Sequence, residues 1–327
     1  MTTKQHHRED FNRLAERWDF PKWYGDLYHD HKVGTLDYSD YRITQNPLKV
    51  SEFWLKMQID NFAKSSGMNP RETAKRLTST QDQEMDIPMF IREMFQNAYD
   101  VRPRDGPPLL FEVEIDEDGS MTISHNGIQF RPPSEEQKNG ELLSLFHLGA
   151  TTKDSSWDSE GQFGIGFKGW VTFFQEVRVS CVSEKEEISV SWRVDSDGYH
   201  SVEIEKEDVR EIARGMRERQ LTTSFTFRLL IPNKPKPSST EILEELNSLT
   251  RFRPHPVTCR VVDHDDNKTE IIHEADVLHH DQDHRILLIR NQGGPKEHTE
   301  KMLGVELEIK KSPEITTAIQ SFIDEKK

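Results

Sequence analysis

Cysteine and long apolar runs are both scarce in this sequence, and each absence excludes a class of protein. Only two of the 327 residues are cysteines, which excludes the disulfide framework of small secreted domains. We therefore expect Cys181 and Cys259 to be reduced core residues. No apolar run approaches the roughly 20 residues that cross a bilayer, and residues 1–10 lack the apolar centre of a signal peptide. These features predict a soluble, cytoplasmic protein that makes no membrane contact.

Positive charge is the minority sign in the composition. The chain has 43 lysines and arginines and 58 acidic residues, which gives a formal net charge of −15 at pH 7. No long basic run occurs. Binding to a nucleic-acid backbone depends on basic side chains that neutralise phosphates, so direct nucleic-acid binding is not favoured. The length of 327 residues predicts two domains, or three.

Three short motifs are present, and the first is helical. Apolar residues between Ile87 and Ala98 recur at helical spacing. Glu93, Asn97 and Asp100 are placed at i, i+4 and i+7, so they share one face of that helix. An acid, an amide and a second acid suit a water-activating base beside a ligand for a divalent metal ion. The alternative is a solvated stripe on a surface helix.

The second and third motifs are a strand that ends in a turn and a glycine-rich segment. Residues 121–124 alternate polar and apolar side chains as a strand does, and Asn126-Gly127 interrupts them. Taken alone, this motif favours a hairpin turn. Residues 161–169 contain four glycines, which let the backbone approach a ligand closely. N–H groups that lead into a helix N-terminus form a cradle for anions, although a tight turn explains such a run equally well.

Together, the three motifs resemble the nucleotide-binding boxes of the GHKL ATPase superfamily, which includes gyrase-type topoisomerases, the ninety-kilodalton heat-shock chaperone, sensor histidine kinases and mismatch-repair ATPases. Residues 93–100 match the box E-x-x-x-N-A-x-D fully, and residues 161–168 match G-x-F-G-x-G-F-K. The second motif matches D-x-G-x-G only in part, because His125 replaces the aspartate and Gln129 replaces the last glycine. The motif forms are most similar to the sacsin-type and chaperone-like branch.

The resemblance implies a role for each site residue. Glu93 is then the general base that activates the attacking water, Asn97 is the Mg²⁺ ligand, and Asp100 is a supporting residue. The other residues that it places around ATP are His125 and Gly127 at the base, Thr152 and Lys153 in the lid, Gly161, Phe163, Gly164, Ile165, Gly166, Phe167 and Lys168 at the phosphates, and Thr223 under the adenine. Lys153 and Lys168 are equally well explained as surface lysines.

His125 is the main departure from the family pattern. An aspartate accepts a hydrogen bond from the adenine amino group, whereas a neutral histidine accepts with one ring nitrogen and through a weaker bond. We expect protonation of His125 below about pH 6.5 to weaken ATP binding. The alternatives are reduced selectivity for adenine, with another group reading the base, and a histidine that only packs beside the pocket.

The predicted order of elements is that of an α/β protein with three parts. Residues 1–80 form a mostly helical extension, which is either packed on the next domain or an arm toward a second subunit. Residues 81–235 form a two-layer α/β sandwich, the Bergerat ATP-binding fold, with its helices on one face of the sheet. After a proline-rich boundary, residues 236–327 form a smaller, transducer-like α/β domain with a closing helix at 312–324. Within it, we expect His279–His284 to be a solvated loop rather than a metal site.

We interpret the chain as an Mg²⁺-dependent ATPase in which binding and hydrolysis of ATP drive lid closure and a conformational or dimerisation change, in a chaperone-like or defence-type role. Its predicted partners are ATP, Mg²⁺, a second copy of the chain and a protein client that the sequence does not identify. The alternative is a nucleotide-gated binding or signalling module with little turnover. A histidine or protein kinase ranks last, because no phospho-acceptor helix pair precedes the first motif.

Overall fold

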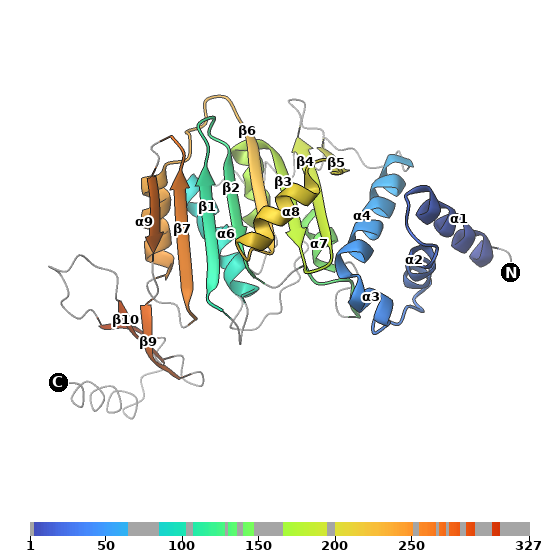
Figure 1. Cartoon of the computed structure of the whole chain (residues 1–327), viewed down its shortest axis with the longest axis horizontal. Helices are drawn as coiled ribbons and strands as arrows, with labels where there is room; N and C mark the ends of the chain where they lie inside the picture. The colour runs from blue at the N-terminus through green and yellow to red at the C-terminus, as the bar shows by residue number, and fades with distance from the viewer. Residues whose placement is uncertain are drawn as a thin grey trace.

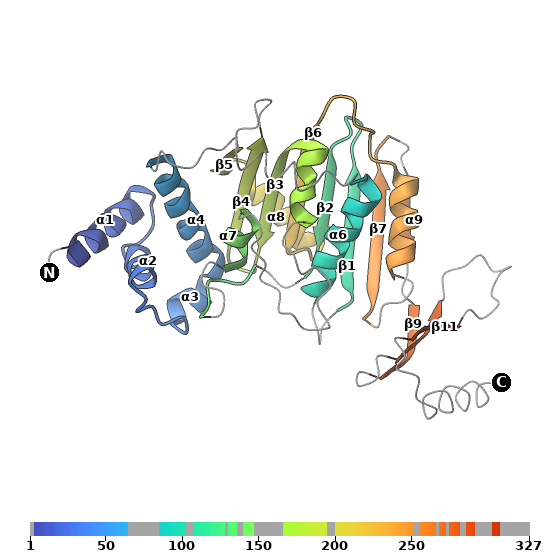
Figure 2. The same ribbon diagram turned by 180° about the vertical axis from the view of Figure 1, so that it is seen from behind.

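An eight-stranded sheet forms the body of the protein and carries helices on both faces (Figures 1 and 2). The computed structural model describes residues 3–64, 85–102, 107–127, 130–135, 140–146, 166–194, 200–250, 255–265, 268–272, 275–281, 286–291 and 303–307. The strands of this sheet are β1 (Leu109–Ile115), β2 (Met121–His125), β3 (Phe174–Val182), β4 (Glu187–Val194), β5 (His200–Ile204), β6 (Thr223–Leu230), β7 (Val257–Asp263) and β8 (Lys268–Ile272). Their order is β5-β4-β3-β6-β2-β1-β7-β8, and each neighbouring pair is antiparallel except β1 and β7.

One face of the sheet is covered by helices α6 (Ile87–Asp100) and α9 (Ser239–Thr250), as Figure 2 shows. Strand β1 is buried at every second residue, as a strand with one core-facing side requires. Helix α6 meets the sheet through aromatic edges, with the rings of Phe95 and Phe111 5.3 Å apart and those of Phe90 and Phe227 5.1 Å apart. The predicted α/β sandwich is therefore confirmed.

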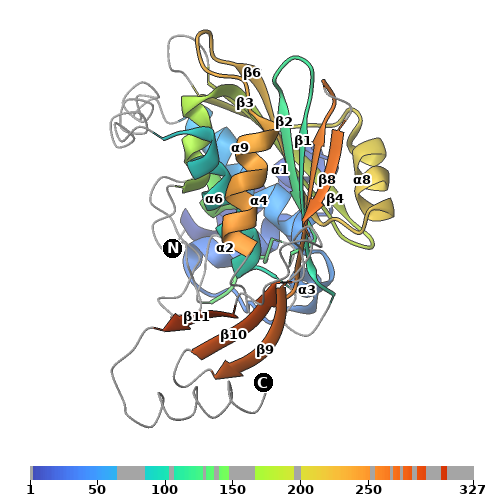
Figure 3. The same ribbon diagram turned by 90° about the vertical axis from the view of Figure 1, so that its left-hand side faces the viewer.

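Helix α8 (Val209–Glu218) lies on the opposite face of the sheet from α6 and α9 (Figure 3). Its buried residues Ala213 and Met216 pack with Val182 and Leu221 in a small second core. We expected every helix of the sandwich to lie on one face, so this position corrects the prediction. The amphipathic pattern of a helix shows that it packs on something, but not which face of a sheet it covers.

The sheet continues past the predicted boundary at residue 235. Strand β7 pairs in parallel with β1 from Val257 to Asp263, and β8 follows at the edge. A parallel strand needs a crossover connection, and α9, which contacts both α6 and β7, provides it. Strands β7 and β8 therefore belong to the main sheet, with α9 packed beside them. The largely exposed proline-rich stretch before α9 is a surface connection.

A separate three-stranded sheet contains β9 (Ala275–Asp281), β10 (Ile286–Asn291) and β11 (Leu303–Leu307). It is the described remainder of the segment predicted as a transducer-like domain, and that role stays a prediction. Strand β9 includes His279, His280 and Asp281. The prediction of a solvated loop at His279–His284 is therefore wrong for these three residues. The closing helix predicted at 312–324 lies outside the described residues.

The amino-terminal extension packs against the β4–β5 edge of the main sheet. Its helices are α1 (Thr3–Arg17), α2 (Trp23–Val33), α3 (Tyr41–Gln45) and α4 (Pro47–Lys64). Helix α4 contacts β4, β5 and the short helix α7 (Gly140–Phe146). Helix α4 is therefore packed on the next domain, and an arm toward a second subunit stays a prediction.

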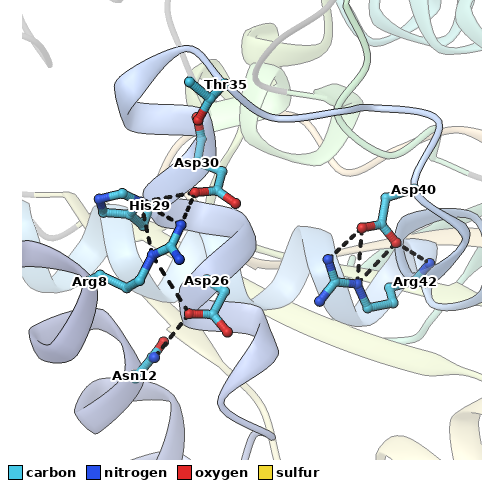
Figure 4. A network of polar contacts seen from close by, with 8 residues as sticks. All are labelled: Arg8, Asn12, Asp26, His29, Asp30, Thr35, Asp40 and Arg42. Atoms are coloured by element: carbon cyan, nitrogen blue, oxygen red, sulfur yellow. Dashed lines mark hydrogen bonds and ion pairs between the residues drawn. The ribbon is translucent and has the colours of Figure 1, made fainter. Parts of the chain in front are cut away.

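A polar network joins α1 to α2 within the extension (Figure 4). Arg8 Nε donates to His29 Nδ1 at 3.3 Å, and the same guanidinium pairs with Asp30. One turn further along α1, Asn12 Nδ2 donates to Asp26 Oδ1 at 3.0 Å. These contacts set the position of α1 on α2.

The carboxylate of Glu186, in the turn between β3 and β4, connects the extension to the sheet. It is buried and accepts the backbone N–H groups of Leu48 and Lys49 at the start of α4, each at 3.2 Å. These are N–H groups that a helix cannot satisfy itself, and the helix dipole favours a negative charge beside them. Burial raises the pKa of Glu186, which shows that the carboxylate is desolvated in the joint.

Replacing Glu186 with alanine is expected to lower the free energy of unfolding by about 1–3 kcal/mol, because two charge-assisted hydrogen bonds are lost. Urea unfolding measures the loss, and faster hydrogen exchange at the start of α4 locates it. Glu184→Ala is the matched control, because Glu184 is an exposed acid in the same turn. Equal unfolding free energies for the two variants would contradict the assigned joint.

The two cysteines lie in the core. Cys181 and Cys259 are free and fully buried, as predicted, and burial raises the pKa of each thiol. In the part of the chain that the structure describes, no helix has the length and apolar character needed to cross a membrane.

Candidate functional site

The first motif lies on the flank of α6 that the core leaves partly exposed. The helix begins after Asp86, whose Oδ1 accepts the Met89 amide at 2.7 Å, as an N-cap residue does. Its apolar positions other than the exposed Met89 are mostly buried, whereas Glu93, Asn97 and Asp100 are each part-buried. The three side chains are spaced one turn apart along one flank, so the predicted row of acid, amide and acid is present.

His125 and Thr223 meet on adjacent strands of the sheet. His125 ends β2 and is paired directly with Thr223, which begins β6, and both residues are buried. Successive side chains of a strand alternate between faces, so Thr223 shares its face with Phe227. Because Phe227 packs on Phe90 of α6, His125 and Thr223 lie on the face that α6 covers.

The glycine-rich motif leads into η1 (Gly166–Thr172), which contacts α6 and β3. The helix expected after this motif is a short 3₁₀ helix. Phe167 is buried there, and its ring lies 5.2 Å from Phe225, which in turn lies 6.2 Å from His125. A row of rings therefore connects the end of the glycine motif to the end of β2.

Part of the predicted site lies outside the described residues. This holds for Thr152, Lys153, Gly161, Phe163, Gly164 and Ile165. Gly166 begins η1 and Lys168 lies within it, but the side chain of Lys168 is not described. The predicted roles of these residues, Thr152 and Lys153 in the lid and the others at the phosphates, stay predictions.

His125 is a neutral hydrogen-bond donor in this structure. It is 6% exposed, and burial lowers its pKa to about 4, so the imidazole is uncharged at neutral pH. The amide of Gly127 donates to Nδ1 at 3.1 Å, which leaves the hydrogen on Nε2. Nε2 has no hydrogen-bond partner among the residues that the structure describes. The expectation that His125 accepts from an adenine amino group is thereby corrected, because the backbone already uses its acceptor nitrogen.

The turn after β2 is held by two residues to which the sequence analysis gave no role. Asn126 accepts the Leu110 amide at 2.8 Å and donates to the Pro108 carbonyl at 2.9 Å, and Thr222 Oγ1 donates to the Gly127 carbonyl at 2.6 Å. An asparagine directly after a strand is a sequence signal for such side-chain-to-backbone bonding. These contacts hold the backbone that fixes the His125 ring.

Gly127 is required at its position by close packing. A Cβ atom there would lie 2.7 Å from Val101 Cγ2 and 2.9 Å from His125 Nδ1. The space that a side chain would need is already filled by the end of α6 and by the histidine ring. Any larger residue would therefore displace the hydrogen bond that orients His125.

The described polar groups on this face include one imidazole N–H donor and several oxygen atoms. The Nε2–H group of His125 offers a hydrogen bond to a base, and the α6 flank offers carboxylate and amide oxygens, which Mg²⁺ prefers. Among the described residues, no group of three or more histidine, cysteine or acidic side chains is placed to hold a metal ion. Asn97 therefore stays a predicted Mg²⁺ ligand that acts with few other protein oxygens.

Comparison with known proteins gives a structural likeness at low sequence identity. No family model matches the sequence, and no curated protein matches it. Among solved structures, the chain is similar to the topoisomerase IV ATP-binding domain of Francisella tularensis in complex with a small-molecule inhibitor, at 13% identity and a TM-score of 0.42. The match covers 61% of this chain and 57% of that chain, so it spans little more than half of the topoisomerase domain.

Proposed function

We propose that this protein binds ATP with Mg²⁺ between α6, η1 and the adjoining ends of β2 and β6, and that it hydrolyses the nucleotide. The supporting observation is convergence on one face of the sheet. Glu93 and Asn97 on α6, Phe167 in η1 and His125 beside Thr223 come from distant parts of the chain and lie on that face. They are the described members of the motifs that resemble the GHKL boxes.

In this proposal Glu93 orients and deprotonates the attacking water. Phosphoryl transfer needs positioning and charge neutralisation more than covalent help, and a part-exposed carboxylate on a well-packed helix is suited to positioning. Asn97, one turn further along α6, holds Mg²⁺ through its side-chain oxygen, and Asp100 supports both. Mg²⁺, when bound, neutralises charge on the phosphates.

The proposed base contact differs from that of an aspartate. His125 presents Nε2–H, so it pairs with an acceptor on the base, such as the ring nitrogen of adenine or the 6-oxo group of inosine and guanine. The adenine amino group is itself a donor and does not pair with it. Discrimination between 6-amino and 6-oxo purines is therefore expected to be weak.

The wider role follows from the resemblance alone. We propose that hydrolysis drives closure of the lid, which contains Thr152 and Lys153, and a conformational or dimerisation change in a chaperone-like or defence-type protein of the sacsin-type branch. Cytoplasmic location and a protein client stay predictions. A nucleotide-gated binding module with little turnover is the second candidate, and the altered contact at His125 favours it. Measuring phosphate release against bound nucleotide separates the two.

Titration calorimetry with a non-hydrolysable ATP analogue tests the proposed binding. We expect saturable binding with a Kd at or below about 1 mM, tightened by Mg²⁺, and a comparable Kd for the inosine analogue. Asn97→Ala is expected to remove most of the Mg²⁺ effect. Arg92→Gln is the control, because Arg92 is an exposed residue of the same helix that pairs with Glu245. If millimolar nucleotide gives neither a heat of binding nor a higher melting temperature, the proposal is wrong.

A further inference from the structure

A cavity lies on the face of the sheet that α8 covers. It has a volume of about 580 Å³ and is bounded by β2, β3, β6, α8 and the turn between β1 and β2. This volume is in the range of small-molecule sites. Figure 3 shows α8 on the opposite face of the sheet from α6, and the residues that line the cavity include none of those of the proposed nucleotide site.

Arg178, on β3, is the central cation of this cavity. Its Nε atom is buried and has no hydrogen-bond partner among the described residues, and its guanidinium forms no ion pair with any of them. A buried guanidinium N–H without a partner is costly, because its lost hydration is not replaced. In a chain with 58 acidic residues, an unpaired arginine beside a cavity indicates a site for an anion.

The hydroxyl groups of Thr226 and Thr122 lie at the register positions next to Arg178 on the neighbouring strands. In the strand register Arg178 is opposite Thr226 on β6, and Thr226 is opposite Thr122 on β2. The two threonine hydroxyls lie 3.3 Å apart, and both residues line the cavity. These three residues therefore offer a guanidinium fork and two hydroxyls on one side of the sheet, a set that suits an oxyanion.

A second and a third arginine complete the positive side of the cavity. Arg228, two residues beyond Thr226, is opposite Glu176 in the register, but that carboxylate accepts from Arg193 at 2.8 Å. Arg228 forms no ion pair within 4 Å with a described residue. Arg219, at the end of α8, also lines the cavity and pairs with two glutamates of β1.

The acidic residues of the cavity lie at one end, in the β1–β2 turn. Asp118 accepts the Ser120 amide at 2.8 Å and the Ser120 hydroxyl at 3.0 Å, and these bonds lower its pKa. Asp116 Oδ1 lies 3.9 Å from His264 Nε2. An anionic group is therefore attracted to the Arg178 end, while the Asp118 end can accept hydrogen bonds from hydroxyls of the same molecule.

We propose that this cavity binds a small organic phosphate, with the phosphate group held by Arg178, Arg228 and the hydroxyls of Thr122 and Thr226. A doubly charged phosphate matches the guanidinium of Arg178, which has no partner among the described residues, and that of Arg228, whose charge otherwise acts on Asp118 without an ion pair within 4 Å. The volume beyond the phosphate accommodates a polar, hydroxyl-bearing remainder directed toward Asp118. The site does not depend on the proposed ATP site.

Calorimetric titration of pyrophosphate into the full chain, without added Mg²⁺, tests this proposal. Arg178→Gln is expected to weaken binding at least about tenfold and Thr226→Val by a smaller factor. Arg214→Gln, which removes the same charge from an exposed position of α8 outside the cavity, is expected to change the affinity less than about twofold. The matching titration with succinate distinguishes a phosphate from a carboxylate ligand.

Three outcomes overturn the proposal: equal pyrophosphate affinity in the wild type and Arg178→Gln, no binding up to about 10 mM, or binding of succinate alone. If pyrophosphate binds on the α6 face instead, the wild type and Arg178→Gln have equal affinities, because Arg178 does not reach that face. Without ligand, Arg178→Gln is expected to keep or raise the melting temperature, since a buried unpaired donor is removed. If that variant does not fold, Arg228→Gln provides the same titration.

Discussion

Replacing Glu93 with alanine is expected to lower the rate of ATP hydrolysis by about 10²–10⁴-fold, which is the usual contribution of a positioned general base. Affinity for a non-hydrolysable ATP analogue is expected to change less than about threefold, because a base acts on the attacking water rather than on ground-state binding. Phosphate release under saturating nucleotide and calorimetry on the same preparation measure the two quantities.

Two further variants make the Glu93 result specific. Glu93→Gln keeps the shape of the side chain and removes its basicity, so it is expected to lose turnover as the alanine variant does. Arg92→Gln changes the neighbouring exposed position of α6 and is expected to hydrolyse ATP at nearly the normal rate. Normal turnover in Glu93→Ala would show that another group activates the water, and loss of both binding and turnover would indicate a structural role.

His125 is expected to make the protein less stable as the pH falls from about 6.5 toward 4. In the folded chain burial lowers its pKa to about 4, whereas an exposed histidine in the unfolded chain titrates near 6.5. Between these values the unfolded state binds more protons, so the free energy of unfolding decreases with decreasing pH. The loss from this one group approaches about 3 kcal/mol below pH 4. Because His125 in the folded chain is protonated only near pH 4, any effect of its protonation on nucleotide affinity is expected near pH 4, and not below about pH 6.5 as first expected.

Urea unfolding at a series of pH values checks this expectation. His125→Asn is the informative variant, since its side-chain oxygen can still accept the Gly127 amide two residues on but does not titrate. It is expected to remove most of the pH dependence below pH 6.5. His264→Asn, at a half-exposed surface histidine, is expected to leave that dependence in place. The same pH dependence in the wild type and His125→Asn would show that His125 is not the buried neutral group.

Most elements of the main sheet could be predicted from local pattern. Helix α6 (Ile87–Asp100) contains the helical spacing predicted between Ile87 and Ala98, because apolar spacing is a local signal. Strand β9 could not be predicted, because a run of histidine and aspartate reads as a solvated loop when its pairing partners are unknown. The position of β7 beside β1 depends on pairing between residues more than a hundred positions apart, and no local signal contains it.

The sequence by itself determined the chemistry available at the candidate site: an acid and an amide one helical turn apart, a glycine-rich segment, and a histidine where the resembling family has an aspartate. Only the tertiary structure decided how these groups are used. The tautomer of His125 depends on an amide two residues away being held by the Asn126 and Thr222 contacts. The unpaired state of Arg178 depends on which carboxylates the register brings opposite it. Both are set by through-space hydrogen bonding and desolvation, which a one-dimensional pattern does not contain.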